Sequence, residues 1–259
     1  MSSAESYRDA QEKLMTLNLL QMAFKEFNTL ESMRAALEKN GVEVSVANLS
    51  RYVNGKAIPK SKLKDSLLEA LTQDSEFGLT IERLINKHII EDVDEFGNIR
   101  ISNLYLLNDS KALKAILFLA MYQKIIPLDI DKIITAEVDG IPVAMTLAHL
   151  LNVDCIYARK KKPLGAENFI TADIQTASLG RVETVGVDEK FIRRQEKVLI
   201  VDDVIRSGST QTALVELVRR CGATPVKVVI IAGIGARWER ITEWNRVELE
   251  VLKVYTEKS

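Results

Sequence analysis

The feature that most constrains how this 259-residue chain folds is the run at residues 198–210. The run opens with consecutive apolar residues that predict a buried strand, and Asp202 and Asp203 follow at the strand's carboxyl end. A short loop rich in glycine and serine comes next, and we expect a helix from Thr210 onward. Backbone amides in such a loop can approach a phosphate closely, and the positive end of the helix adds to the attraction. Because carboxylates accept hydrogen bonds from sugar hydroxyls, the run predicts a phosphate in the loop and a ribose on the two acids.

Two other nucleotide-binding loops do not fit this sequence. A Walker A loop needs Gly-Lys-Ser/Thr, which does not occur after Gly208. A Rossmann fingerprint needs three glycines, whereas Gly233 and Gly235 stand without the third. The remaining alternative is an ordinary serine turn beside two solvated acids, and the complete run makes it the weaker interpretation.

Strand and helix patterns alternate on both sides of the run. We expect strands at residues 133–137, 154–159, 197–204, 226–233 and 247–255, and helices at 109–124, 142–151 and 210–221. Before them, residues 77–90 predict an amphipathic helix, and the acidic, glycine-containing stretch 91–98 predicts a linker or a hairpin. Alternation of this kind predicts a parallel sheet covered by helices, with ligands bound beyond the carboxyl ends of its strands.

The run at 198–210 resembles the 5-phosphoribosyl-1-pyrophosphate (PRPP) signature of type I phosphoribosyltransferases. The resemblance covers residues 100–255 and implies that the two acids bind the ribose hydroxyls while residues 206–210 hold the 5-phosphate. The PRPP- or nucleotide-binding residues that it implies are Asp202, Asp203, Val204, Ile205, Arg206, Ser207, Gly208, Ser209 and Thr210.

Two further segments match places where this family binds pyrophosphate. One follows the first expected strand, where Gly140 would let backbone amides approach a diphosphate, and the other is the basic run at 159–162. Taken alone, that basic run fits a solvated charged turn equally well. The expected pyrophosphate-binding residues are Glu137, Val138, Asp139, Gly140, Arg159, Lys160 and Lys161. The resemblance also implies PRPP as ligand or effector, with Mg²⁺ accompanying it and no metal held by protein side chains alone.

The polar, glycine-punctuated stretch at 164–195 is similar to the flexible loop that covers PRPP in the enzymes of this family. Adenine phosphoribosyltransferases carry a Ser-Leu-Glu-Tyr-like run there, whose glutamate is assigned to proton transfer. The corresponding stretch from Ser178 to Arg181 lacks that acid, although Glu183 lies close by. We therefore assign Ser178 and Arg181 to the flexible loop, leave the catalytic residue unassigned, and favour PRPP binding without catalysis.

Residues 1–75 predict helices only. The pairs at 40–41 and 54–55, both Asn-Gly, end two of them, and a short helix at 46–53, capped by Ser45, lies between these turns. On that helix Val46, Leu49, Tyr52 and Val53 share the inward face, whereas Ala47, Asn48, Ser50 and Arg51 point outward.

This segment resembles the helix-turn-helix of phage-repressor-like DNA-binding domains. Asn and Arg side chains are suited to base edges, and the following lysines are suited to phosphates, since the stretch from Asn48 to Lys64 contains no acidic residue. The expected DNA-binding residues are Ser45, Ala47, Asn48, Ser50, Arg51, Lys56, Lys60 and Lys62. The alternative is a helical cap that mediates dimerisation.

Composition limits the setting of the protein. A formal net charge of −1 argues against a chain that coats nucleic acid over its whole surface. No apolar run reaches the roughly 20 residues that span a bilayer, and the amino terminus is polar, so we expect a cytoplasmic protein without a membrane partner. Two cysteines and two histidines, none of them at metal-ligand spacing, are expected to be structural.

Together these features predict an α/β protein with an all-α helix-turn-helix domain at residues 1–90 and a type I phosphoribosyltransferase fold, a central parallel sheet flanked by helices, at 91–259. The combination resembles bacterial purine repressors and archaeal PRPP-binding regulators. It implies a homodimeric transcriptional regulator that binds double-stranded DNA, senses PRPP or purine nucleotides and controls purine or nucleotide metabolism genes. The alternative is a catalytic purine phosphoribosyltransferase of adenine type with a helical oligomerisation domain, whose base-binding hood would include residues 234–238.

Overall fold

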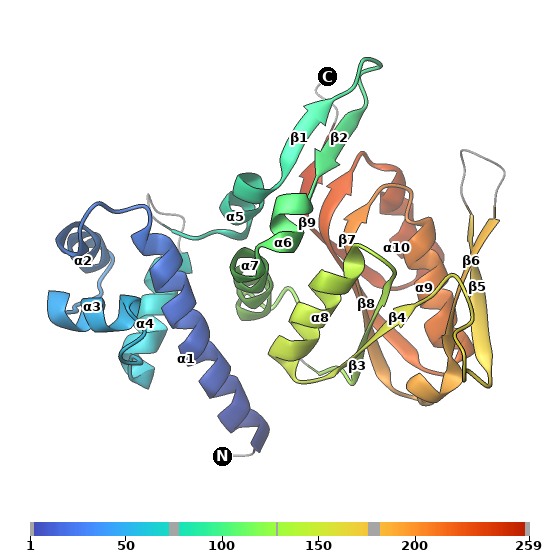
Figure 1. Ribbon diagram of the computed structural model, residues 1–259, viewed down its shortest axis with the longest axis horizontal. Coiled ribbons are helices and arrows are strands. Elements are labelled where there is room, and N and C mark those ends of the chain that lie inside the picture. The colour runs from blue at the N-terminus through green and yellow to red at the C-terminus, as the bar shows by residue number, and fades with distance from the viewer. Residues whose placement is uncertain (1–2, 73–77, 128, 176–181, 257–259) are drawn as a thin grey trace. The chain divides into compact units, whose positions relative to one another are not determined.

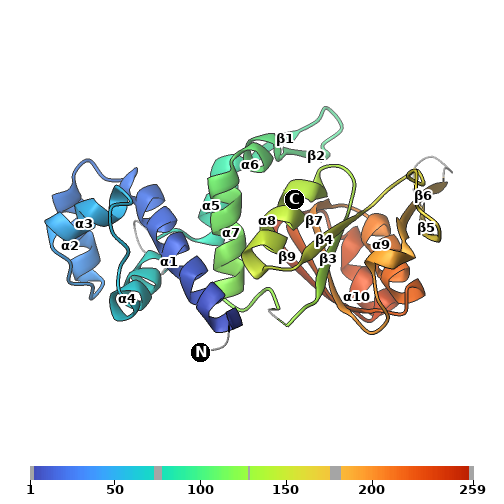
Figure 2. The ribbon, with the colours of Figure 1, turned by 60° about the horizontal axis from the view of Figure 1, so that its bottom comes forward.

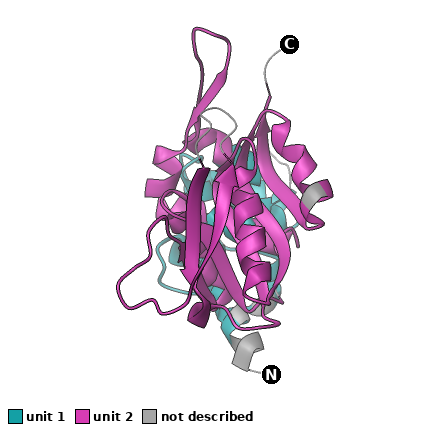
Figure 3. Ribbon diagram, turned by 90° about the vertical axis from the view of Figure 1, so that its right-hand side faces the viewer, with its two compact units in different colours: residues 1–84, 114–119 teal, residues 85–113, 120–259 magenta. Residues whose placement is uncertain are grey.

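The computed structural model describes residues 3–72, 78–127, 129–175 and 182–256 (Figure 1). The chain divides into two compact units, residues 1–84 with 114–119 and residues 85–113 with 120–259, which are coloured separately in Figure 3. The sequence predicts a boundary between two domains after residue 90, and that boundary stays a prediction.

The first unit is built from helices. Its described residues up to 72 form α1 (Ser3–Phe24), α2 (Leu30–Lys39), α3 (Val46–Val53) and α4 (Ser61–Thr72), as predicted. The bounds of α3 are those expected from the sequence, because the Ser45 hydroxyl accepts a hydrogen bond from the Asn48 amide at 3.2 Å and Gly55 adopts a φ of +67°. Leu49 and Tyr52 are buried, so α3 packs through the predicted face.

The helix predicted at 77–90 is wrong at both ends. The helix α5 (Ile81–His88) starts after Thr80, whose hydroxyl accepts a hydrogen bond from the Arg83 amide at 3.1 Å. Ile90 already belongs to β1 (Ile90–Val93), which pairs antiparallel with β2 (Ile99–Ser102). Of the two alternatives for residues 91–98, a linker or a hairpin, the structure shows the hairpin, and its first strand ends the helix early (Figure 1).

A parallel sheet forms the centre of the second unit. Within the described residues it has five strands in the order β4-β3-β7-β8-β9, all parallel, as predicted for an α/β fold. These strands are β3 (Lys132–Ala136), β4 (Asp154–Ala158), β7 (Lys197–Ile205), β8 (Thr224–Ile234) and β9 (Glu248–Tyr255). The helix α8 (Gly140–Leu151) covers one face, and α9 (Ser209–Arg220) with α10 (Ile241–Asn245) covers the other (Figure 2). The remaining elements are the helices α6 (Leu104–Asn108) and α7 (Ser110–Tyr122) and the short turns η1 (Glu189–Phe191) and η2 (Arg237–Arg240).

The strand order reverses between β3 and β7. From β3 the chain moves outward through α8 to β4, whereas from β7 it moves the other way through α9 to β8. In open α/β sheets, ligands bind in the crevice at such a reversal, beyond the carboxyl ends of the strands. The loops after β3 and β7 are therefore the expected place for a ligand.

The segment at 164–195 contains regular structure that the sequence analysis missed. It forms the antiparallel pair β5 (Phe169–Gln175) and β6 (Val182–Asp188). Ala172 and Ile174 of β5, and Val185 and Val187 of β6, are buried in the same apolar cluster as residues of α9. The sequence analysis did not recognise these strands, although the alternation of apolar and polar residues along them is typical of strands buried on one face.

Candidate active site

The loop after β7 presents hydroxyl groups at the first turn of α9. The Ser207 and Ser209 hydroxyl oxygens lie 3.1 Å apart, and Thr210 is half-buried in the same turn. Gly208 adopts a φ of +80°, and a Cβ atom there would lie 1.8 Å from the Ile241 side chain. The positive φ and this close contact favour glycine here, and the predicted phosphate-binding residues do lie together at a helix start. Val204 and Ile205 complete β7 just before it.

The two aspartates at the end of β7 have different surroundings. Asp202 is only 6% exposed, and it accepts a hydrogen bond from the Gln211 side chain at 2.7 Å. Burial raises its pKa well above the usual range, and the charge of Asp203 adds to the effect. Asp203 is half-buried and accepts a hydrogen bond from the Asn103 side-chain amide. Asp203 is therefore the more accessible acid, while Asp202 is held inside the fold.

The loop between β3 and α8 lies directly against these acids. A Cβ atom on Gly140 would lie 2.2 Å from the Thr135 hydroxyl and 2.3 Å from a carboxylate oxygen of Asp202. The Asp139 charge helps to raise the pKa of Asp203, after the larger effect of burial. The Glu137–Val138 peptide bond in this loop is cis, and the Val138 side chain is exposed. The structure thus brings the predicted pyrophosphate loop and the predicted ribose acids to one edge of the sheet.

The predicted basic residues lie beside the same loop. The Arg159 guanidinium lies 3.8 Å from the Glu137 carboxylate, and the Lys160 amide donates to that carboxylate at 2.8 Å. The Lys160 ammonium also pairs with Glu183 of β6 at 2.8 Å. Lys161 is exposed. Glu137, Arg159 and Lys160 therefore form a group, whereas the predicted loop residues Ser178 and Arg181 lie outside the described residues.

A cavity of 460 Å³ opens at the ends of β7 and β8. Its walls come from the β1–β2 hairpin (Asn98 and Ile99), from Arg206 and Ser207 after β7, from residues 234–237 and from Thr256. Most of the hood segment suggested for the enzymatic alternative therefore does line a cavity. Trp238 does not line the cavity. It is 8% exposed and belongs to the apolar core. Its ring packs so closely on Gly233 that a Cβ atom on that glycine would lie 3.0 Å from the ring.

Sequence reasoning missed the contribution of the hairpin segment. Asn103, at the start of α6, reaches Asp203, and the Arg206 guanidinium donates to the Ile99 carbonyl oxygen at 3.4 Å. No local pattern marks Ile99 or Asn103, because their partners lie about a hundred residues further along the chain. Only the tertiary fold brings this segment to the site.

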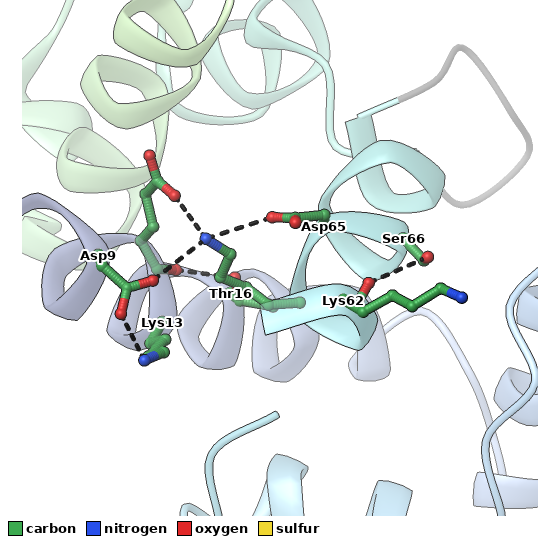
Figure 4. A network of polar contacts seen from close by, with 8 residues as sticks. Asp9, Lys13, Thr16, Lys62, Asp65 and Ser66 are labelled. Atoms are coloured by element: carbon green, nitrogen blue, oxygen red, sulfur yellow. Dashed lines mark hydrogen bonds and ion pairs between the residues drawn. The ribbon is translucent and has the colours of Figure 1, made fainter. Parts of the chain in front are cut away.

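The residues predicted to bind DNA lie in the first unit. Ala47, Asn48, Arg51, Lys56, Lys60 and Lys62 are exposed, Ser50 is half-buried, and Ser45 caps α3. Lys64, which the sequence analysis placed at the end of the basic stretch, is only 5% exposed. Its ammonium pairs with Glu12 at 2.6 Å, Asp65 at 3.2 Å and Asp9 at 3.5 Å, in the network drawn in Figure 4. Lys64 therefore joins α4 to α1 and offers no charge to a surface partner.

The two cysteines are free thiols, half-buried at Cys155 and buried at Cys221. Burial raises the pKa of each thiol to about 11, so both are protonated at neutral pH. Among the residues that the structure describes, no group of three or more His, Cys, Asp or Glu side chains is arranged to hold a metal ion. In the same part of the chain, every helix is too short or too polar to cross a bilayer.

Sequence comparison identifies the family. Residues 107–255 match the phosphoribosyl transferase domain, and because this match covers more than half of the chain, the protein belongs to that family. The xanthine phosphoribosyltransferase of Streptococcus pneumoniae serotype 4 is 34% identical over 103 residues, which are 39% of this chain and 53% of that enzyme. The xanthine phosphoribosyltransferase of Streptococcus pyogenes serotype M49 is 29% identical over 153 residues, 58% of this chain and 79% of the enzyme. The chain thus spans little more than half the length of the pneumococcal relative.

Solved structures show the same fold. Adenine phosphoribosyltransferase from Thermoanaerobacter pseudethanolicus aligns with a TM-score of 0.59 and 21% identity, over 68% of this chain and all of that one. The Giardia lamblia enzyme complexed with 9-deazaadenine aligns with a TM-score of 0.59 and 20% identity, over 68% of this chain and 98% of that one. At these identities the likeness concerns the fold alone.

These comparisons overturn the prediction of a DNA-binding transcriptional regulator. The relatives are named as purine phosphoribosyltransferases, which favours the enzymatic alternative. The regulator hypothesis depended on a short capped helix and a basic stretch. Small helical domains of other kinds share that spacing, and Lys64 contributes no surface charge to the stretch.

Proposed function

We propose that this protein is a purine phosphoribosyltransferase, which transfers the 5-phosphoribosyl group of PRPP to a ring nitrogen of a purine and releases pyrophosphate. One observation carries the proposal: the hydroxyl-rich loop after β7, the Glu137–Gly140 loop after β3 and the 460 Å³ cavity all lie at the carboxyl edge of one parallel sheet. The names of the relatives support the same activity.

In this proposal the β7–α9 loop binds the 5-phosphate. Amides at the start of α9 and the hydroxyls of Ser207, Ser209 and Thr210 supply donors, and the helix dipole favours the negative charge. Asp203 accepts hydrogen bonds from the ribose hydroxyls, because it is the acid that is not enclosed by Gln211 and Gly140. Mg²⁺ enters as part of the substrate, bound to the diphosphate of PRPP.

The chemical step breaks the bond between C1 of the ribose and the diphosphate oxygen and forms a bond between C1 and the purine nitrogen. Negative charge develops on the leaving pyrophosphate, and the proton on the purine nitrogen must leave. Arg159 and Lys160 lie at the Glu137–Gly140 loop, where they can stabilise that charge. Glu183 is a candidate to accept this proton, because it would lose its ion pair with Lys160 when Lys160 binds pyrophosphate.

The purine occupies the cavity in this proposal. Ile99 and Ile234 offer apolar surface, while Asn98, Ser207 and Thr256 offer polar groups, which is the usual mixture for a small planar ligand. The cavity shares Arg206 and Ser207 with the phosphate loop, so a base and a PRPP bound at the two places would lie side by side.

A steady-state assay of the full chain with Mg²⁺, PRPP and each common purine tests the proposal by following nucleotide formation. We expect turnover at about 1–1000 s⁻¹, the ordinary range for enzymes. The double variant Asp202→Asn/Asp203→Asn should lose this activity while its circular dichroism spectrum stays native. The proposal is wrong if folded protein that binds PRPP forms no nucleotide from any of these purines.

A further inference from the structure

The β1–β2 hairpin has an exposed and acidic tip. Its residues 91–98 contain no lysine or arginine but four acids, which are Glu91, Asp92, Asp94 and Glu95. Phe96 at the turn is 81% exposed, and Val93 near it is 55% exposed. All of β1 is exposed, so neither face of this strand is covered by the residues that the structure describes. Because a two-stranded hairpin is marginally stable at best in water, such a surface favours a partner that covers it.

The turn of the hairpin holds this tip in one conformation. The Asp94 carboxylate accepts hydrogen bonds from the backbone amides of Phe96 at 3.0 Å and Asn98 at 2.9 Å. Gly97 adopts a φ of +83°, which lets the chain reverse direction between the two strands. The hairpin is an arm of the second unit (Figure 1), and its ordered turn places Phe96 at the tip. An ordered surface loses little conformational freedom when it binds.

A surface of the opposite charge lies in the first unit, at residues 51–62, from the last turn of α3 to the first turn of α4. This α3–α4 segment contains no acid and four exposed cations, which are Arg51, Lys56, Lys60 and Lys62. Ile58, between the lysines, is 51% exposed. Unlike Lys64, these cations form no ion pair with any described residue, and the same is true of Glu91 and Glu95. Each surface thus combines an exposed apolar side chain with charges that the described residues leave unpaired.

The two surfaces are complementary to each other but not to themselves. Two hairpins placed together would bring acid against acid, and like charges across an interface repel. A hairpin placed on the α3–α4 segment brings its acids to the lysines and Phe96 to Ile58. Opposite charges then fix the register, and the two apolar side chains leave water together. Every copy of the chain carries both surfaces, so two copies can exchange two identical contacts and close a dimer with two-fold symmetry.

We propose that the hairpin tip of one copy docks on the α3–α4 segment of a second copy, and that two copies exchange this contact reciprocally in a homodimer. Asn98 and Ile99 of the same hairpin line the cavity at the ends of β7 and β8. The second copy therefore binds next to the candidate active site. The contact itself does not depend on the reaction that the protein catalyses.

Sedimentation equilibrium of the full chain measures this association. At a salt concentration of about 50 mM we expect dimers in equilibrium with monomers. Raising the salt concentration to about 500 mM should weaken the association about 10-fold or more, because salt screens exposed charges.

Charge reversals assign the contact to the two surfaces. The hairpin variant Glu91→Lys/Glu95→Lys and the segment variant Lys56→Glu/Lys60→Glu should each weaken self-association about 10-fold or more. An equimolar mixture of the two variants should associate more strongly than either variant alone. The reason is that the acidic hairpin of the segment variant meets the basic segment of the hairpin variant, which keeps one contact with its native charges.

The matched control is Glu239→Lys/Glu243→Lys, on η2 and α10. Both of its glutamates are exposed, and it changes the net charge as much as the hairpin variant does. It should associate like the wild type. Circular dichroism spectra and urea unfolding identify any variant that has lost its fold, and the mixture of folded variants then decides.

Three outcomes would overturn the proposal. The first is a wild-type chain that stays monomeric at low salt. The second is a dimer whose association constant neither reversal changes, since such a dimer would use another surface. The third is a pair of weakened variants that do not associate when mixed, because a hairpin that binds the segment of its own chain would give that result.

Discussion

The side-chain amide of Asn103 donates a hydrogen bond to the Asp203 carboxylate, although 100 positions separate the two residues in the chain. Asn103 begins α6, just after the β1–β2 hairpin, and Asp203 is the accessible acid at the end of β7. Burial is the largest influence on the pKa of Asp203 and raises it, whereas the Asn103 hydrogen bond lowers it. The hairpin segment therefore helps to keep Asp203, the acid proposed to bind ribose, in its charged form.

Replacing Asn103 should change the pH dependence of PRPP binding. Binding requires the Asp203 carboxylate, so affinity should fall as pH decreases through the raised pKa of this group. In Asn103→Ala one hydrogen bond that favours the charged form is lost, so the fall should begin at a higher pH than in the wild type. Calorimetric titration with PRPP from acidic to neutral pH measures the shift. Asn108→Ala, on the same helix but bonded only to the Leu104 carbonyl oxygen, should leave the profile in place.

The buried acid Asp202 should cost stability at neutral pH. A carboxyl group whose pKa is raised in the folded state favours folding below its unfolded pKa, and that contribution is lost as pH rises through the folded pKa. Asp202→Asn keeps an acceptor for Gln211 and removes the charge, so it should raise the Tm at neutral pH by about 2–4 °C for each kcal/mol gained. At pH values below the ordinary carboxyl range the difference should vanish. Calorimetric scans at several pH values measure the Tm of both proteins, and a lower Tm of the variant at neutral pH would contradict this account.

A side chain at Gly208 should destabilise the fold and weaken PRPP binding. A Cβ atom at a positive φ costs about 1–2 kcal/mol by itself, and at this position it would also collide with Ile241. Gly97→Ala provides the matched control, because Gly97 has a φ of +83° and open space around it. Gly208→Ala should therefore lower the free energy of unfolding further than Gly97→Ala and weaken PRPP binding by about 10-fold or more. Similar PRPP affinities in the two variants would show that the phosphate loop adapts to a side chain.

The Lys64 network should respond differently to the loss of each partner. Burial lowers the pKa of Lys64, but hydrogen bonds to Glu12 and Asp65 outweigh it and keep the ammonium charged. Glu12→Gln leaves a buried charge with weaker partners and should lower the free energy of unfolding by about 1–3 kcal/mol. Lys64→Met removes the buried charge and leaves carboxylates that water reaches in part, from 24% exposed at Glu12 to 68% at Asp65, so its cost should stay below about 1 kcal/mol. Urea unfolding measures both, and Lys13→Met, at the more exposed pair with Asp9, should have little effect.

Local patterns were sufficient to predict the elements that depend on neighbouring residues. The start and end of α3 follow from Ser45 and Gly55, since capping depends on side chains and dihedral angles within one turn. The parallel sheet follows from the alternation of strands and helices, and the hydroxyl-rich loop follows from Gly208 and its neighbouring serines. Local patterns did not predict the function, because the exposed polar face of a helix does not show which partner it contacts.

What the sequence determined by itself is the buried strand β7, its two terminal acids and the loop that turns into α9. Each of these depends on consecutive residues, so their order along the chain is enough to define them. Only the tertiary structure decided which acid stays accessible, that Lys64 is buried, and that the hairpin around Ile99 reaches Arg206 to close a cavity. These features arise between residues that are distant in the chain, and burial, charge pairing and enclosed volume exist only after the chain has folded.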